Sequence, residues 1–180
     1  MSFQVWRDGR SGVVRAFSAP QPIDYPSPIG TRPSYLFPFS DQVLYPRTLG
    51  VRTAVTRLAI EPPWLARLLA FASGSGLARV LATDAICNVI AGIRRHRSPS
   101  AGAPFALRVN VRHGERSKHA VLLGHTQANA AAAGAEAVAR ALIAQEWKIP
   151  GAWMPEQAMA PAAFLTRIAA RGLTVDFPAA

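Results

Sequence analysis

The clearest alternation of hydrophobic and polar positions lies between residues 105 and 112. Successive side chains of a strand point to opposite sides, so this stretch separates an apolar face from a polar face. The apolar set is Phe105, Leu107, Val109 and Val111. Gly114 lies in a turn, and residues 119–124 return as a partner strand. The pattern therefore predicts a hairpin of two strands.

Shorter strands are predicted near the N-terminus, over residues 3–7 and 13–17. Asp8-Gly9 between them is typical of a tight hairpin turn. A third strand is predicted over residues 51–60.

Two helices are predicted to follow that strand. Pro62-Pro63 suits the first turn of a helix and Gly74 suits its end, and apolar residues from Trp64 to Phe71 supply its apolar stripe. The second helix is predicted over residues 77–93, and a loop follows it.

The C-terminal part predicts two further helices. One covers residues 127–145, and its alanine-rich run 130–135 has so little bulk that a neighbouring element can approach closely. The other begins near Pro161, ends at Gly172 and leads into a short strand over residues 173–175.

Residues 18–50 are rich in proline and aromatic residues. Proline forbids long regular elements, so we expect an ordered but irregular segment packed on a surface. Hairpins mixed with helices favour an α+β fold, with a mixed, largely antiparallel sheet and helices packed on one face. The length of 180 residues fits a single domain over 1–180.

The composition indicates a globular protein, since 50% of the residues are hydrophobic. The formal charge of +10 suggests nucleic acid, but the basic residues are spread along the chain and no nucleic-acid motif accompanies them. We therefore do not expect nucleic acid as the partner. The cluster Arg94-Arg95-His96-Arg97 is expected to cap a helix end, with a phosphate-binding patch as the alternative.

Cys87 is the only cysteine, which excludes an intrachain disulfide and a zinc site made of cysteines. The longest apolar stretch, residues 77–93, contains Arg79 and Asp84, so we expect a buried helix and no membrane span. No signal peptide is evident in the first 20 residues. We expect a cytoplasmic protein.

Motifs for common chemistries are missing from the sequence. The nearest match to a dinucleotide-binding loop is Gly74-Ser75-Gly76-Leu77-Ala78-Arg79, which has Arg79 in place of the third glycine and follows a helix instead of a strand. The four histidines lack metal-site spacing. We expect no cofactor site and no metal site in this chain, and we assign no catalytic residue.

Candidate sites for an anion remain. Arg108 and Arg112 share a strand face with Asn110 between them, and arginine forks bind carboxylates. The alternative is a polar face that only meets solvent. His125 and Thr126 precede the long helix, where free amides could meet an anion or Thr126 could simply cap the helix.

Asp41 and Arg47 are the polar residues of interest in the proline-rich segment. Asp41 could cap a turn, Arg47 could pair with it, or either could line a cleft.

The C-terminal third carries a pattern that resembles a known family. An alanine-rich helix leads into Ile149-Pro150-Gly151-Ala152-Trp153-Met154-Pro155-Glu156-Gln157, and then into Phe164-Leu165 and Ala170-Arg171-Gly172. This order resembles the C-terminal end of saccharopine dehydrogenase-like oxidoreductases. The run Tyr25-Pro26-Ser27-Pro28-Ile29-Gly30 and the segments around Asp41 and Arg47 resemble their middle, so the resemblance covers residues 12–176.

The resemblance implies a function and a missing partner. In this family an N-terminal Rossmann domain binds NAD(P), and an α+β domain shapes the substrate site and often the dimer contact. The chemistry joins or cleaves two amino acids through a secondary amine, so the substrates carry several carboxylates. Only about a dozen residues precede the matching region here, too few for a nucleotide-binding unit of roughly 30.

We therefore expect the substrate-binding and dimerisation portion of such an enzyme, not catalytic alone. NAD(P) is expected only with a separate Rossmann-domain partner chain, and we expect a homodimer and an exposed apolar surface on the alanine-rich helix. The alternative is a stand-alone binding module for an acidic ligand or partner.

Overall fold

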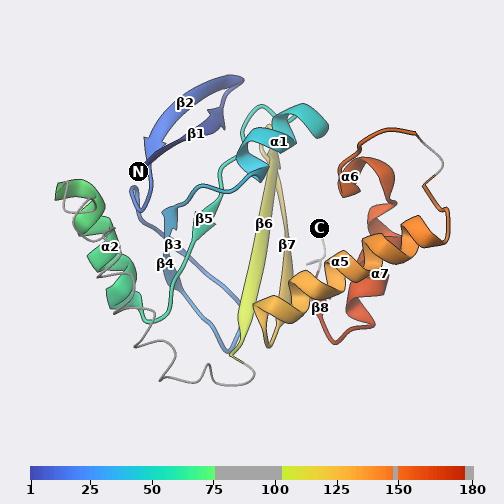
Figure 1. The fold of residues 1–180 in the computed structure, drawn as a ribbon. Coiled ribbons are helices and arrows are strands. Elements are labelled where there is room, and N and C mark those ends of the chain that lie inside the picture. Colours follow the sequence, from blue (N-terminus) through green and yellow to red (C-terminus); the bar gives the residue numbers. More distant parts are fainter. Residues whose placement is uncertain (76–102, 148–149, 177–180) are drawn as a thin grey trace, which may run out of the picture. The chain divides into compact units, whose positions relative to one another are not determined.

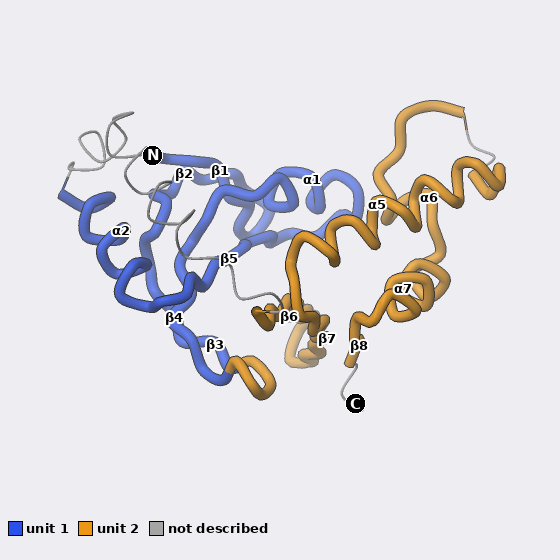
Figure 2. The backbone as a smooth tube through the Cα atoms, turned by 60° about the horizontal axis from the view of Figure 1, so that its bottom comes forward, with its two compact units in different colours: residues 1–24, 30–98 blue, residues 25–29, 99–180 orange. Residues whose placement is uncertain are grey.

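The computed structural model describes residues 1–75, 103–147 and 150–176. The helix expected over residues 77–93 lies outside these ranges. The chain divides into two compact units, which Figure 2 shows in blue and orange. Unit 1 is Met1–Asp24 with Gly30–Ser98, and unit 2 is Tyr25–Ile29 with Pro99–Ala180.

The α+β class is confirmed, with antiparallel strands and helices interspersed along the chain (Figure 1). Every pairing of named strands is antiparallel, and the described strands form one sheet of two strands and two sheets of three. No helix within the described ranges is long and apolar enough to cross a lipid bilayer.

Unit 1 begins with the predicted hairpin. Strand β1 (Ser2–Arg7) pairs with β2 (Arg10–Arg15) along its whole length. Asp8 and Gly9 have φ angles of 51° and 81°, as the two central residues of a type I′ turn require.

Regular elements occur inside the proline-rich segment, so the expectation of an irregular chain over 18–50 was wrong in part. Strands β3 (Gln21–Ile23) and β4 (Arg32–Leu36) pair there, and helix α1 (Asp41–Thr48) follows them. Pro22 lies directly opposite Pro33 in this pair. Because the two residues without an N–H share one position, the neighbouring pairs can keep their hydrogen bonds.

The strand expected over residues 51–60 is mostly absent. Only β5 (Arg57–Leu58) pairs with β4, and Ala54 forms one isolated bridge with Trp6. Helix α2 (Pro63–Ser75) then begins at the predicted proline pair, and its described part extends to Ser75.

Unit 2 contains the longest hairpin of the described chain. Strand β6 (Phe105–His113) pairs with β7 (Arg116–Gly124) without a bulge, and β8 (Thr174–Asp176) pairs with the other side of β7. Gly114, with a φ angle of 58°, occupies the first central position of the two-residue turn. Strand β6 is therefore an edge of this sheet.

The helices of unit 2 cover one face of its sheet. These are α5 (Gln127–Ile143) and α7 (Pro161–Ala169), with the short α6 (Pro155–Ala158) between them. The core joins Ala133 and Ala137 of α5 to Ile168 of α7, Leu173 and the strand residues Phe105, Leu122 and Val175.

The small side chains of α5 allow this close packing, as the alanine-rich pattern predicted. Ala133, Ala137 and Ala141 are buried. We expected an exposed apolar surface on this helix. These three alanines do not contribute to such a surface, because they are buried. The large exposed apolar side chains of α5 are Leu142 and Ile143 at its C-terminal end, and Ala131, Ala132 and Ala135 are also exposed.

Candidate functional site

A polar face on the β6–β7 hairpin joins three of the residues singled out from the sequence. Arg108, Asn110 and Arg112 alternate with Leu107, Val109 and Val111 along β6, so they lie on one side of the sheet. This is the side opposite the helices, because Phe105 and Leu122 contact the helical core from the other side. We call Arg108, Asn110, Arg112 and His119 the polar face.

Cross-strand pairing completes the polar face. His119 lies directly opposite Asn110, and Ser117 lies opposite Arg112. The Nε of Arg108 donates to Oδ1 of Asn110 at 3.1 Å, so the amide oxygen orients the guanidinium. This contact leaves the Asn110 amide nitrogen available as a donor beside two guanidinium groups. A row of donors of this kind suits a carboxylate or phosphate oxygen.

The two residues at the start of α5 lie away from the hairpin turn. His125 is exposed, and Thr126 occupies the N-cap position with an extended backbone, as predicted. The Thr126 side chain makes no capping hydrogen bond. Both residues follow the end of β7 that pairs with Phe105, so they lie at the opposite end of the hairpin from Arg112.

Asp41 and Arg47 belong to unit 1, at the two ends of α1. Asp41 accepts a hydrogen bond from Oγ1 of Thr56 at 2.9 Å. No ion pair joins Asp41 to Arg47 in the described ranges, so the structure does not show the pairing that was one of the alternatives for these residues. Their positions suit the helix dipole, with the acid in the first turn and the base in the last.

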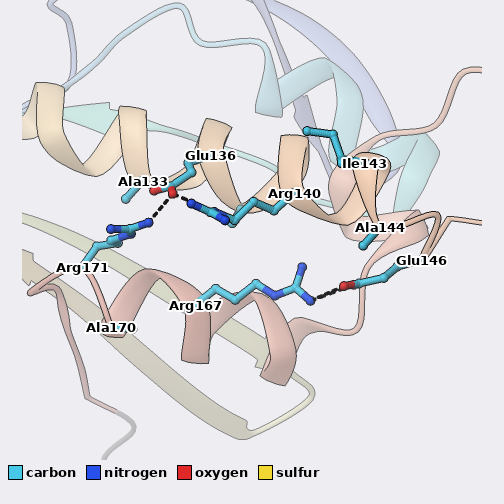
Figure 3. Close-up of a pocket in the computed structure, with 10 residues that line it drawn as sticks. Ala133, Glu136, Arg140, Ile143, Ala144, Glu146, Arg167, Ala170 and Arg171 are labelled. Carbon is cyan, nitrogen blue, oxygen red and sulfur yellow. Dashed lines mark hydrogen bonds and ion pairs between the residues drawn. The ribbon is translucent and has the colours of Figure 1, made fainter.

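A groove between α5 and α7, with a volume of about 660 Å³, brings together residues that the sequence analysis missed (Figure 3). Its charged residues are Glu136, Arg140, Glu146, Arg167 and Arg171, and alanines and Ile143 supply its apolar lining. Glu136 and Arg140 are four residues apart on α5, and Arg171 follows Arg167 of α7 by four residues, just after the end of that helix. That spacing is the pattern by which the cluster could have been found.

The groove neutralises most of its own charge. Arg140 donates to Oε1 of Glu136 at 2.8 Å, and Arg171 contacts the same oxygen from the α7 side. These contacts, the hydrogen bond from Arg140 foremost, hold the pKa of Glu136 below its ordinary value. The carboxylate therefore stays ionised and attracts both arginines.

A second ion pair closes the other end of the groove. Nη2 of Arg167 lies 2.6 and 2.7 Å from the two carboxylate oxygens of Glu146, and its Nη1 is buried without a hydrogen-bond partner within the described part of the chain. Arg167 ties α7 to the turn after α5, and Arg171 ties the turn after α7 to α5. We interpret the groove as a helix-to-helix contact, because its guanidinium groups are largely committed to carboxylates.

Metal chemistry finds no support in the part of the chain that the structure describes. There, no three His, Cys, Asp or Glu side chains gather closely enough to hold an ion. The polar face, which places two arginines, an amide and a histidine on one side of two paired strands, is the stronger candidate for ligand binding.

Comparison with known proteins adds no relative. No protein-family model and no curated protein matches the chain, so its similarity to saccharopine dehydrogenase-like oxidoreductases rests on the motifs quoted above.

Proposed function

We propose that this chain is the substrate-binding and dimerisation portion of an NAD(P)-dependent oxidoreductase of the saccharopine dehydrogenase-like kind, acting in the cytoplasm. The observation that carries the ligand-binding part is the polar face, where Arg108, Asn110 and Arg112 lie on one side of β6. The ordered motifs of the C-terminal third support the oxidoreductase context. NAD(P) would come with a separate Rossmann-domain chain, because the cofactor supplies the hydride chemistry.

The polar face suits a substrate with several carboxylates. Each arginine can grip one carboxylate with two parallel hydrogen bonds, and the two are four residues apart on one strand. Four residues of a strand span about 13 Å. A ligand that carries carboxylates at both ends, such as two amino acids joined through a secondary amine, can contact both arginines together.

The ligand test uses isothermal titration of the isolated chain with such a secondary amine. The double variant Arg108→Ala/Arg112→Ala should bind at least tenfold more weakly, since a hydrogen bond to a charged group contributes about 1.5–3 kcal/mol. Arg10→Ala/Arg15→Ala is the matched control, because it removes two exposed strand arginines of unit 1 and the same net charge. Equal binding by all three proteins would refute the assignment of the polar face.

The alternative is a stand-alone module that binds an acidic ligand without any oxidoreductase partner. A simple dicarboxylate such as glutarate distinguishes the two. The oxidoreductase proposal expects the joined amino acids to bind more tightly, because the substrate offers more carboxylates than glutarate does. Equal affinity for both ligands would favour the stand-alone module.

A polyanion is a second candidate, favoured by the charge at the hairpin tip. Arg112, His113, Arg116 and Lys118 cluster there with only Glu115 as an acid, and all five are exposed. Nucleic acid would then bind with an affinity that falls steeply with salt. Arg116→Ala/Lys118→Ala should weaken such binding and leave titration with the small ligand unchanged, and a chain that ignores nucleic acid at low salt would exclude this candidate.

A further inference from the structure

The other side of β6 exposes a row of apolar side chains. Leu107, Val109 and Val111 are 53%, 49% and 59% exposed, although they lie on the same sheet face as the core residue Phe105. The hairpin extends beyond the part of the sheet that the helices cover. We call these three residues the apolar row.

The apolar row lies on an edge strand. Among the described strands, β7 is the only neighbour of β6, and β6 contains neither proline nor a bulge. A long edge with exposed apolar residues is a template for pairing with another strand. Charged side chains can block such an edge, but Arg108 and Arg112 project from the sheet face opposite to the apolar row.

The turn fixes which backbone groups face this open side. Across a two-residue turn the flanking residues exchange hydrogen bonds, here His113 with Arg116. His113, Val111 and Val109 therefore direct their backbone N–H and C=O groups towards β7. Asn110 and Arg112 direct theirs towards the open side.

From this geometry we propose that β6 pairs antiparallel with β6 of a second copy of the chain, about a two-fold axis at Val109. The inference rests on the dimerisation part of the proposed function and names its interface. Val109 then faces the partner's Val109, and Leu107 faces the partner's Val111, so the apolar rows of both copies join.

Avoidance of like charges, together with the overlap of the two apolar rows, favours this register. With the axis at Val109, Arg108 lies opposite the partner's Asn110, and Arg112 opposite the partner's Ala106. An axis at Arg108 would set two copies of Arg108 against each other, and an axis at Asn110 would set Arg108 against the partner's Arg112. Like charges directly opposite are destabilising. An axis at Leu107 or Val111 also avoids them, but only the Val109 axis joins the two apolar rows along their whole length.

Cysteine crosslinking tests the register. In this register Val109 forms a non-hydrogen-bonded pair with its copy, whose Cα atoms are expected about 4.5 Å apart, close enough for a disulfide. Val109→Cys, made together with Cys87→Ser to leave one thiol, should form a covalent dimer under mild oxidation. Val111→Cys in the same background is the matched control, because its two copies would stand about 13 Å apart along the strands.

Light scattering tests the interface without new thiols. The wild-type chain should be a dimer, and Val109→Lys should be a monomer with an unchanged circular dichroism spectrum. Val13→Lys, which alters an exposed valine of β2, should remain a dimer.

The outcomes separate this inference from the proposed function. A dimer in which Val109→Cys and Val111→Cys crosslink equally, or neither crosslinks, keeps the dimerisation but overturns the β6 interface. A wild-type chain that stays monomeric overturns both. If Val109→Cys crosslinks specifically but the wild-type chain does not bind the carboxylate ligand, only the ligand-binding part of the proposed function is refuted.

Discussion

Gly124, at the end of β7, supports the core of unit 2 because it has no side chain. It lies directly opposite Phe105, and the ring of Phe105 occupies the space where a Cβ atom would be. A Cβ there would also come within 2.7 Å of Cδ2 of Leu173. Phe105 and Leu173 both belong to the core of unit 2, so the bare backbone at this position lets the sheet and the helices meet.

Gly124→Ala should therefore destabilise the chain by about 1–3 kcal/mol, the usual cost of forcing a methyl group into a packed core. Urea unfolding measures this change. Gly12→Ala is the control, because Gly12 is also a strand residue but has no neighbour within 4 Å of an added Cβ. Equal stability of the two variants would contradict the packing role of Gly124.

Glu136 links stability to pH. Its pKa is lowered in the folded chain, chiefly by the hydrogen bond from Arg140, so ionised Glu136 stabilises the fold. That contribution is present above the ordinary value of 4.5 and is lost as the pH falls through the lowered pKa.

Glu136→Gln should thus lower stability near neutral pH and match the wild-type chain in acid, as measured by urea unfolding across this range. Glu115→Gln, in the exposed turn of the hairpin, should leave the shape of the pH profile unchanged. A constant difference between Glu136→Gln and wild type at every pH would argue against the ion-pair role.

At the scale of elements, α5 combines a buried face of small residues with an exposed face. Ala133, Ala137 and Ala141 repeat every four residues and are buried, which brings α7 and the sheet close to the helix axis. Ion pairs from Arg167 of α7 and from Arg171, just after that helix, fasten the same contact at its edges.

Ala137→Leu should disturb this contact by overpacking and cost about 1–3 kcal/mol. Ala135→Leu is the matched control on the exposed side of α5, where leucine and alanine have similar helix propensity. Thermal unfolding followed by circular dichroism compares the two. A larger loss of stability for Ala135→Leu than for Ala137→Leu would show that the assignment of the buried face of α5 is wrong.

Elements specified by local patterns were predictable from the sequence. The β6–β7 hairpin, α5 and α7 each carry their own periodicity and their own turn or end residue. The pair β3–β4 was not predictable, because it depends on Pro22 meeting Pro33, two residues that look like strand breakers when read separately. The polar face followed from alternation within one strand, whereas the groove needed the packing of two helices.

At the scale of the whole molecule, the chain crosses between its two units more than once. Tyr25–Ile29 belongs with unit 2, although the residues on both sides of it belong to unit 1. The hydrophobic core of unit 2, however, is built entirely from residues between 105 and 175.

A fragment of residues 99–180 should therefore fold by itself. Trp147 and Trp153 report on this unit, since the other tryptophans, Trp6 and Trp64, belong to unit 1. Their fluorescence should follow one cooperative urea transition, which Gly124→Ala should shift to lower urea. A fragment without a cooperative transition would show that unit 2 needs the rest of the chain.

The alternation along β6 has a consequence for how this sequence can change length. The polar face and the apolar row interleave at every residue between Leu107 and Arg112. Loss or gain of one residue here would turn the arginines towards the helical side and the valines away from it. Insertions or deletions of two residues within β6 should accordingly be tolerated better than those of one residue. A change of two residues shifts the pattern along the strand without exchanging its faces.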